Sequence, residues 1–498
     1  MKGVYTCEQC HLMDQKMADL FNYSGYQLME RAVKGIESVV SAQLDNKKIL
    51  IVCGPGNNGG DGFALSRLLM NKYYDASVLN ANPLMYKSSE HTQLFFRQAK
   101  HEGVSFVDST VDFSQYDVIF DCLFGTGLDR ELEEPYVGLV KRINESDAYV
   151  IAVDIPSGLN GDGLFKSSEV VRANKTVTIG CLKPCMINGS YRAYCGELCI
   201  TNFYDAKVHP NMHEAVVVDR YDLKKFLPKR KIQSNKSTYG KGLFIGGSKR
   251  MPGAITLSLK SALRSGLGMT SAMIPEDIYS ILALQLNEVM YIPKASDGLG
   301  FMDDNLALDE LSTYDVICIG NGLGKGQGCQ NFIKQVLLSD RPVVVDGDGI
   351  GLVAKELWLL ERPVLTILTP HVKEMSDLCG ESVEAIHDHP FEVLDAFHQK
   401  YPTTLVLLKD DVMMVADGSE HVIIDLGNNA LAKGGSGDVL AGLVTSFFGQ
   451  CNNAHQAAIT ASMVLGLAAR KAVEKLGYYS VCSNDVINSI ADVLKNYS

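Results

Sequence analysis

Short apolar segments alternate with helical patterns from about residue 48 to the end of the chain, and this alternation restricts the fold more than any other feature. The apolar segments of the first half are KILIVC, YDVIFD, YVIAVD and TVTIG, and those of the second half are GLFIGG, YDVICIG, PVVVDG, VLTIL and TLVLL. Strands that alternate with helices form parallel sheets with helices on both faces. The sequence therefore predicts an α/β protein.

A polar, basic stretch, KKFLPKRKIQSNKSTYGK, interrupts the alternation at a seam near residues 205–240. A chain of 498 residues is too long for one ordinary hydrophobic core. We therefore predict two α/β domains, at residues 1–222 and 223–498. We interpret the basic stretch as a solvated linker rather than a nucleic-acid patch, because the chain as a whole is acidic.

The overall charge and hydropathy exclude several classes of partner. Hydrophobic residues make up 46% of the chain and charged residues 21%, which is typical of a globular protein in water. The formal charge of −12 argues against general binding of nucleic acid or an anionic membrane. The start, MKGVYTCEQCHLMDQKM, has no apolar core of a signal peptide, and no apolar run is long enough for a membrane span. We expect a cytoplasmic protein with small-molecule partners, and the apolar helical faces leave both a monomer and a homo-oligomer open.

Two cysteine patterns could indicate a bound metal or haem. The stretch CEQCH at residues 7–11 matches a haem attachment motif, but it also begins a predicted helix with Thr6 and Gln9 in capping-box positions. The second pattern, with spacing near that of a zinc site, comprises Cys181, Cys185, Cys195 and Cys199. Alternate side chains of the strand-like segment GELCI face opposite sides, which disfavours a closed zinc site. We interpret the thirteen cysteines as free thiols.

The glycine-rich segment CGPGNNGGDGF at residues 53–63 follows the first strand and formally contains G-x-G-x-x-G. A dinucleotide-binding turn of the dehydrogenase type also needs an acidic residue at the end of the next strand, where it bonds the ribose. The next predicted strand, ASVLNAN, ends in Asn80 and Asn82. The sequence therefore disfavours an ordinary NAD-dependent dehydrogenase.

Three strands of the first half end in polar residues. NNGGD follows the first strand, Asp121 ends YDVIFD, and Asp154 ends YVIAVD shortly before Ser157. The carboxyl ends of parallel strands form the binding crevice of an open sheet, and bare glycine backbone there can approach an anion such as a pyrophosphate. Asn58, Asp121 and Ser157 are hard oxygen donors that suit an alkali or alkaline-earth cation. One such aspartate can be a simple cap, but three together indicate a binding site.

The second half is rich in glycine at its strand ends, and residues 433–442, KGGSGDVLAG, carry the sharpest signal. A glycine run that opens a helix presents free N–H groups and the positive end of the helix dipole to a phosphate. Asp438 in the first turn is placed to take a proton from a hydroxyl as that hydroxyl attacks phosphorus. The segments IGGS, GNGLG and DGD occur in the same half, so a phosphate site is favoured over a simple helix cap.

The motifs NNGGDG, FDCLFGTGL and AVDIPSGLNGDG resemble the NAD(P)H-hydrate epimerase domain over roughly residues 1–220. The resemblance implies a Rossmann-like, three-layer α/β/α domain that interconverts the R and S epimers of NADH or NADPH hydrate. It implies a potassium ion held by Asn58, Asp121 and Ser157, and Asp154 is our candidate for acid/base work because it ends a strand facing the hydrated ring. Lys183 stands where the family usually has a lysine. The residues implied to contact the hydrated cofactor are Asn57, Asn58, Gly59, Gly60, Asp61, Gly125, Thr126, Gly127, Leu128, Asp129, Arg130, Glu131 and Asp154.

The motifs IGGSKRMPGA, GNGLG, LTPH and GGSGDVLAG, in this order, resemble the ribokinase-like ADP- or ATP-dependent NAD(P)H-hydrate dehydratases over roughly residues 225–498. The resemblance implies a ribokinase-like α/β/α domain that phosphorylates the hydroxyl of the S epimer and then loses phosphate to restore NAD(P)H. It implies Mg²⁺ with the nucleotide and Asp438 as the general base, and ADP is expected because fused chains of this type usually use it. The implied substrate contacts are Ala254, Gly322, His371 and Asp438. The implied nucleotide contacts are Lys409, Asp410, Asp411, Val412, Met413, Gly434, Gly435, Ser436 and Gly437.

The sequence departs from the family pattern beside the predicted nucleotide. The family usually has Lys-Gly where this chain has Lys409 and Asp410, and Asp411 adds a second negative charge. Nucleotide binding then requires that both carboxylates point away from the phosphates or meet magnesium. Lys433, where a threonine is usual, could offset one of these charges.

Two other functions compete with a bifunctional repair enzyme. The first is a ribokinase-like kinase that acts on a vitamin precursor and carries an accessory N-terminal domain. The second makes the N-terminal domain a non-catalytic binding module, which predicts damaged strand ends, whereas Asn58, Asp121, Asp154 and Ser157 are all present.

Overall fold

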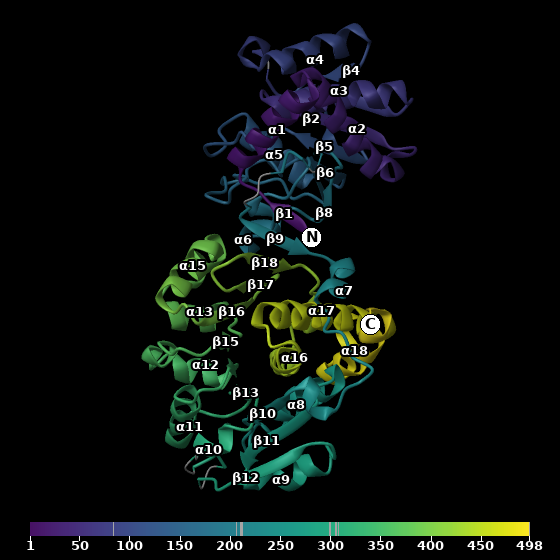
Figure 1. Ribbon diagram of the computed structural model, residues 1–498. Helices are drawn as coiled ribbons and strands as arrows, with labels where there is room; N and C mark the ends of the chain where they lie inside the picture. Colours follow the sequence, from purple (N-terminus) through teal and green to yellow (C-terminus); the bar gives the residue numbers. More distant parts are fainter. Residues whose placement is uncertain are drawn as a thin grey trace. The chain divides into compact units, whose positions relative to one another are not determined.

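The computed structural model describes residues 1–82, 84–205, 207–209, 213–297, 300–303, 306 and 308–497. The chain forms two compact units, Lys2–Ala215 and Met1 with Val216–Ser498, which we call the N-terminal and the C-terminal unit. Each contains a sheet flanked by helices (Figure 1). Within the described residues, every helix is too short or too polar to cross a membrane.

The N-terminal unit contains a seven-stranded sheet in which every described pairing is parallel. In spatial order its strands are β4 (Ser105–Val107), β3 (Asp75–Asn80), β2 (Lys48–Cys53), β5 (Val118–Cys122), β6 (Tyr149–Val153), β7 (Lys175–Thr178) and β8 (Glu197–Ile200). The predicted strands KILIVC, YDVIFD, YVIAVD and TVTIG are confirmed as β2, β5, β6 and β7.

Alternate residues of the buried strands enter two separate cores, which explains the three layers. Ile49 and Ile51 of β2 pack with α2 (Gly25–Leu44), α3 (Asn57–Asn71) and α4 (Glu90–His101). Leu50 and Val52 pack on the other face, with α5 (Tyr136–Glu145). Because side chains alternate along a strand, a strand buried on both faces is a continuous apolar run, as KILIVC is.

The first helix, α1 (Cys7–Phe21), precedes the alternating region. It begins with the predicted capping box, in which the Thr6 hydroxyl accepts from the Gln9 N–H and the Gln9 side chain accepts from the Thr6 N–H. A short strand, β1 (Lys2–Val4), leads into it, and α6 (Gly189–Arg192) lies near the other end of the unit's chain. The helix-start interpretation of CEQCH is therefore confirmed.

The sheet of the C-terminal unit is parallel in its centre and antiparallel near one edge. In spatial order its strands are β9 (Ala215–Val218), β18 (His421–Ile424), β17 (Met413–Ala416), β16 (Thr404–Lys409), β15 (Thr366–Leu368), β14 (Val343–Val345), β13 (Val316–Ile319), β10 (Lys241–Ile245), β11 (Met269–Pro275) and β12 (Met290–Lys294). The predicted strands GLFIGG, YDVICIG, PVVVDG, VLTIL and TLVLL are confirmed. The antiparallel pair β17 and β18 is a feature that the alternation does not predict.

Helices cover both faces of this sheet as well (Figure 1). One face packs against a layer of helices, and their apolar residues form one core with Val316 and Cys318 of β13. These helices are α8 (Pro252–Ser265), α16 (Ser436–Cys451), α17 (Ala454–Ser480) and α18 (Ser483–Tyr497). The green helices in Figure 1 lie on the opposite side: α11 (Gln327–Leu337), α12 (Asp348–Val353), α13 (Val372–Cys379) and α15 (Pro390–Lys400). The smaller elements are α7 (Leu223–Phe226), α9 (Glu276–Ala283), α10 (Leu308–Leu311) and α14 (Val383–Asp388).

Both sheets contain a switch point, where the strand order reverses. In the N-terminal unit β2 pairs with β3 on one side and with β5 on the other, and in the C-terminal unit β10 lies between β11 and β13. Connections leave such neighbouring strands in opposite directions, which opens a crevice at the carboxyl ends of the strands. The predicted site residues follow the carboxyl ends of strands in both units.

Candidate active sites

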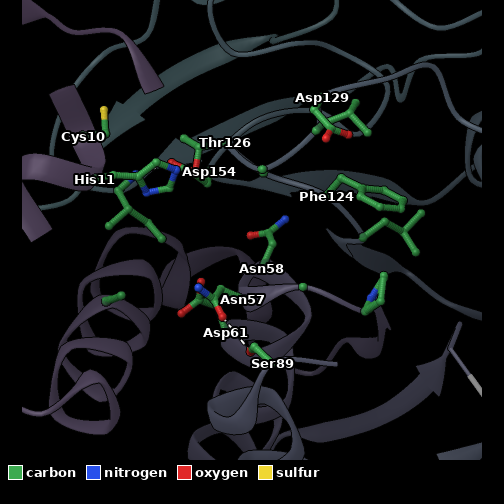
Figure 2. Close-up of a pocket in the computed structure, with 18 of the residues that line it drawn as sticks. Cys10, His11, Asn57, Asn58, Asp61, Ser89, Phe124, Thr126, Asp129 and Asp154 are labelled. Atoms are coloured by element: carbon green, nitrogen blue, oxygen red, sulfur yellow. Dashed lines mark hydrogen bonds between the residues drawn. The ribbon is translucent and has the colours of Figure 1, made fainter. Parts of the chain in front are cut away.

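The N-terminal unit has a cavity of 720 Å³ at its switch point. Its walls come from the segments that follow β2, β5 and β6, together with α1 and the start of α2 (Figure 2). The predicted residues that line it are Asn57, Asn58, Asp61, Gly125, Thr126, Gly127, Leu128, Asp129, Arg130, Glu131 and Asp154. The volume suits one large organic ligand of the size expected for a dinucleotide portion.

Gly59 and Gly60, the two remaining predicted cofactor contacts, are buried in the first turn of α3 and do not line the cavity. A Cβ on Gly59 would lie 1.9 Å from the Gly54 carbonyl oxygen, and one on Gly60 would lie 2.8 Å from Met29 Cε and Thr92 Oγ1. These glycines therefore let α3 pack closely against the strand that precedes it and against its neighbours. This packing brings the start of α3 up to the cavity.

The start of α3 is suited to an anion. Gly56 is its N-cap and offers no side-chain acceptor to the first-turn N–H groups. Asn57 accepts a hydrogen bond of 2.7 Å from the hydroxyl of Ser89, which is itself the N-cap of α4 and lines the cavity. Two helix starts therefore border the same cavity wall (Figure 2).

Asp154 forms a buried ion pair at the end of β6. Its Oδ1 accepts a bond of 2.5 Å from Lys183 Nζ and further bonds from the Thr178 hydroxyl and the Ile179 N–H. Burial alone would lower the pKa of Lys183, but the Asp154 carboxylate outweighs it and the pKa is raised above its ordinary value. Asp154 has the left-handed backbone conformation, with φ 66°, which few residues other than glycine adopt. A strained backbone and three donors thus hold one carboxylate at the cavity wall.

A cluster of oxygen-bearing side chains lies beside this pair. Asp121 is fully buried and accepts bonds from the N–H of Ser157 at 2.8 Å and from its hydroxyl at 2.6 Å. Burial raises the pKa of Asp121 to about 6, although the bonds from Ser157 oppose it. Among the residues that the structure describes, the buried amide oxygen and nitrogen of Asn58 have no hydrogen-bond partner. A Cβ on Gly125 would lie 3.4 Å from Asn58 Cγ and 3.2 Å from Asp154 Oδ2, so this glycine keeps the space between them open (Figure 2).

Several cavity residues are not predicted from the sequence. They include Cys10, His11 and Asp14 of α1, with Ser89, His91, Glu133, Glu134, Tyr136 and Tyr204 from elsewhere. Lys183, which the resemblance singles out without a role, lines the cavity as well. Tyr204 donates to Asp14 at 2.6 Å, and burial raises the pKa of Asp14. Residues on α1 cannot be placed in the site from the sequence, because this helix precedes the alternating region and follows no strand end.

In the C-terminal unit, Asp438 lies in the first turn of α16, directly after the glycine loop. Gly435 is the N-cap of α16 with φ 96°, and no side chain caps the first turn. The loop therefore leaves first-turn N–H groups available to an anion beside the Asp438 carboxylate. Burial raises the pKa of Asp438 to about 6, opposed by a bond from Asn321 and reinforced by the charge of Asp346.

A hydrogen-bonded network joins four predicted strand ends to Asp438. Asn321 Nδ2 donates to Asp438 Oδ1 and to Asp346 Oδ2, both at 2.8 Å. Asp346 Oδ1 accepts from Lys409 Nζ at 2.9 Å and from the Thr369 hydroxyl at 2.6 Å. A Cβ on Gly437 would lie 3.3 Å from Lys409 Nζ, so the ammonium group faces the glycine loop. The network brings a carboxylate, an ammonium group and a helix start together.

The other three predicted substrate contacts of this unit follow strands of the same sheet: Ala254 lies in the first turn of α8 after β10, Gly322 follows β13, and His371 follows β15. A Cβ on Gly322 would lie 2.9 Å from Ala254 Cβ, so these two residues adjoin. His371 caps α13 by accepting from the Glu374 N–H, and it pairs with Lys409 through a backbone bridge. The structure therefore links His371 to the same strand end that carries the ammonium group.

Two of the charges that depart from the family pattern, those of Asp410 and Lys433, have specific partners. Asp410 accepts from His387 Nδ1 at 2.9 Å, so its carboxylate has a local partner in α14. Burial raises the pKa of Asp410, while the His387 charge lowers it. The sequence predicts that Lys433 could offset one of the two aspartates, but its ammonium group donates to the carbonyls of Tyr479 and Val481, both at 2.6 Å, at the end of α17. That prediction is wrong, because helix-end carbonyls compete for the cation.

The two sites define a two-domain α/β enzyme, with a ligand cavity in one unit and, in the other, a carboxylate beside a helix start that has no side-chain cap among the described residues. The family model described as NAD(P)H-hydrate dehydratase matches residues 243–492, and the model described as YjeF-related protein N-terminus matches residues 25–185. The bifunctional NAD(P)H-hydrate repair enzyme of Thermofilum pendens is 31% identical, covering 97% of this chain and 94% of its own. That of Coxiella burnetii is 29% identical and covers 95% of each chain.

The chain belongs to the family of bifunctional NAD(P)H-hydrate repair enzymes. Among solved structures, a ribokinase-like superfamily protein of Enterococcus faecalis is 23% identical, with a TM-score of 0.50, and covers 58% of this chain and 99% of its own. This likeness confirms the ribokinase-like fold predicted for the C-terminal half.

Proposed function

We propose that the chain repairs hydrated NADH and NADPH with one activity in each half. The half at residues 1–222 interconverts the R and S epimers of the hydrate, and the half at residues 223–498 converts the S epimer back to NAD(P)H with consumption of ADP. The observation that carries the proposal is the Asp438 site: a partly buried carboxylate beside an uncapped helix start and the Lys409 ammonium group.

In the C-terminal half, Asp438 is the general base. Its ionised carboxylate takes the proton of the ring hydroxyl as that hydroxyl attacks the terminal phosphorus of the nucleotide. The N–H groups of Gly434, Gly435, Ser436 and Gly437 stabilise the charge that develops on the phosphoryl oxygens, because fixed dipoles need no reorganisation. Loss of the new phosphate then restores the ring double bond.

Lys409 and its neighbours hold the nucleotide. The ammonium group is fixed by Asp346 and faces the glycine loop, which places it to neutralise phosphate charge. The residues from Asp410 to Met413 connect β16 to the start of β17 and contact the phosphates, while the Asp410 carboxylate pairs with His387. Mg²⁺, when bound with ADP, supplies further neutralisation of the phosphate oxygens. Ala254, Gly322 and His371 border the hydrated ring.

In the N-terminal half, Asp154 is the acid/base group that faces the hydrated ring. Lys183 fixes the carboxylate through Oδ1, which leaves Oδ2 directed toward Gly125 and Asn58 at the cavity wall. The start of α3 binds the pyrophosphate, and the segment from Gly125 to Glu131 covers the nucleotide.

Asn58, Asp121 and Ser157 are the proposed ligands of a potassium ion. All three carry oxygen atoms, and the buried Asn58 amide oxygen has no hydrogen-bond partner in the described part of the chain, as expected of a ligand to a hard cation. Such a cation, when bound, supplies positive charge close to the phosphates and the hydrated ring. Replacement of Asn58 by alanine should therefore weaken the binding of potassium to the N-terminal half.

The proposed chemistry is tested with purified protein and the S epimer of NADH hydrate alone. With ADP, NADH absorbance returns and free phosphate appears in equal amounts. A vitamin-precursor kinase would give neither product and would instead accumulate a phosphorylated small molecule. The absence of NADH recovery with both ADP and ATP would overturn the proposal.

A further inference from the structure

The two cysteine patterns of the sequence have no part in the proposed chemistry, yet the structure brings one member of each together. Cys10 of α1 and Cys181, just after β7, are 171 residues apart in the chain, and their sulfur atoms are 3.4 Å apart. Both side chains are buried, and one thiol donates to the other sulfur. This is a preformed pair rather than two isolated core cysteines.

One thiol of the pair, that of Cys10, lines the cavity. Cys10 lines the 720 Å³ cavity, as do Lys183 and Ile179 on either side of Cys181 (Figure 2 shows Cys10 beside His11). By contrast, Cys53, Cys122, Cys185 and Cys195 are fully buried and do not line it. A small solute that enters the cavity therefore meets Cys10, whose sulfur contacts that of Cys181.

The surroundings favour a thiolate in the pair. The hydrogen bond from Cys10 lowers the pKa of Cys181, burial opposes it, and the Lys183 ammonium group lowers it further. The thiolate is the form of cysteine that reacts with oxidants and with disulfides. A thiolate in contact with a second thiol is the arrangement in which oxidation ends in a disulfide.

We propose that Cys10 and Cys181 form a redox modification site, at which a peroxide oxidises the two thiols to a disulfide. The thiolate attacks a peroxide oxygen, the O–O bond breaks, and a sulfenic acid and a hydroxide or alkoxide form. The second thiol, as it loses its proton, attacks the sulfenic sulfur; the S–S bond forms, the S–O bond breaks and water leaves. With hydrogen peroxide, two thiols and one H₂O₂ give one disulfide and two molecules of water.

The disulfide would act on the epimerase site through Lys183, and this consequence rests on the proposed function. A covalent bond is shorter than the observed contact, so its formation draws α1 and the segment that follows β7 together. Lys183 lies two residues beyond Cys181 and holds Asp154 through the bond of 2.5 Å. Because a displacement of about 1 Å can cost about 100-fold in rate, we expect a loss of about that size in epimerase activity alone.

The test treats the full chain with a small excess of hydrogen peroxide, alkylates the remaining thiols and maps the peptides by mass spectrometry without reduction. We expect a Cys10–Cys181 cross-link that dithiothreitol removes. C10S and C181S will lack it, and C482S, which removes the exposed Cys482 thiol, will retain it. The proposal is overturned if Cys10 and Cys181 both remain alkylated at a peroxide dose that oxidises Cys482.

Activities are followed in the same samples. Peroxide should lower epimerase activity of the wild type and of C482S, dithiothreitol should restore it, and dehydration of the S epimer should not change. C181S should show no peroxide-dependent loss relative to its own untreated sample, and an equal loss in C181S would overturn the link to Lys183. The cross-link is scored by mass, so a protein without epimerase activity would refute the proposed function and still test the thiol pair.

Discussion

The two sites use a buried Lys–Asp pair in different ways. In the N-terminal unit Lys183 bonds directly to Asp154, the candidate acid/base group. In the C-terminal unit Lys409 bonds to Asp346, and the neutral amide of Asn321 connects that pair to Asp438 by hydrogen bonds. Burial consequently raises the pKa of Asp438 to about 6. Because Lys409 bonds to Asp346 rather than to Asp438, the Asp438 carboxylate stays basic enough to accept a proton from a hydroxyl near neutral pH.

The largest expected effect comes from removing the base of the C-terminal site. D438N keeps the shape of the side chain and its place beside Asn321 but removes the proton acceptor. We expect kcat for dehydration of the S epimer to fall about 10²–10⁴-fold, measured as the return of NADH absorbance with ADP. Epimer interconversion, followed by chromatography, is the internal control and should not change. A loss below about tenfold would remove Asp438 from the role of base.

K183M tests the direct pair in the N-terminal unit. The substitution leaves the Asp154 carboxylate at the cavity wall without its buried ammonium partner. Removing one partner of a buried ion pair lowers the free energy of unfolding by about 3–5 kcal/mol. We expect urea unfolding of the N-terminal unit to shift by about this free energy. The double variant D154N/K183M removes both charges and should recover part of the stability. Equal stability of K183M and the wild type would show that the pair is not desolvated.

The pH dependence of dehydration tests directly whether Asp438, which Lys409 does not hold as Lys183 holds Asp154, acts as a base. Asp438 accepts a proton only when ionised, so dehydratase kcat should fall about tenfold per pH unit below its pKa of about 6 and level off above it. The folded-state pKa lies above the ordinary value of 3.8, so the folded protein binds this proton more tightly than the unfolded chain. Ionisation of Asp438 therefore lowers stability as the pH rises through about 6, and D438N should remove that part of the stability profile.

A cation at Asn58 would bring positive charge to the N-terminal cavity, as the Lys409 ammonium group does near Asp438. We expect potassium chloride, compared with choline chloride at equal ionic strength, to raise the Tm of the N-terminal unit by about 2–4 °C for each kcal/mol of binding energy. N58A should abolish the shift, because it removes the unpaired amide oxygen. An equal potassium effect in N58A would exclude the proposed ligand set.

The smallest effect concerns the charge beside the nucleotide. H387A leaves Asp410 without its partner near Lys409, and we expect the KM for ADP to rise by at most about fivefold, the scale of a partly exposed ion pair. H455A is the matched control, because His455 Nδ1 pairs with Asp417 at the same distance of 2.9 Å on another part of the sheet. An equal change in the KM for ADP in H387A and H455A would show that the Asp410 charge does not act specifically on nucleotide binding.

The sequence predicts those parts of the sites that follow strands. Asp121, Asp154, Asn321 and Asp346 end or follow buried apolar segments, and parallel strands bring such positions to one edge. The order of the strands, and hence which ends are neighbours, depends on packing between distant segments. For this reason the network through Asn321 is visible only in the structure.

The side-chain partners are the least predictable part. Cys10 and Asp14 reach the cavity from a helix outside the alternating region, and His387 pairs with Asp410 from a helix with no motif of its own. The opposite charge of Lys433 favours the aspartates as its partners, but its ammonium group bonds to carbonyls at the end of α17 instead. The hydrogen-bond partner of a long polar side chain depends on distances of a few ångströms, and the sequence pattern does not contain these distances.

The most direct test of the account uses a mixture of both epimers of NADH hydrate with the purified full chain. With ADP, both epimers should return completely to NADH, because the N-terminal half feeds the S epimer to the C-terminal half. D154N should stop at the fraction present as S epimer, apart from slow spontaneous interconversion. Complete and equally fast conversion by D154N, or no conversion by the wild type with ADP and with ATP, would contradict the account.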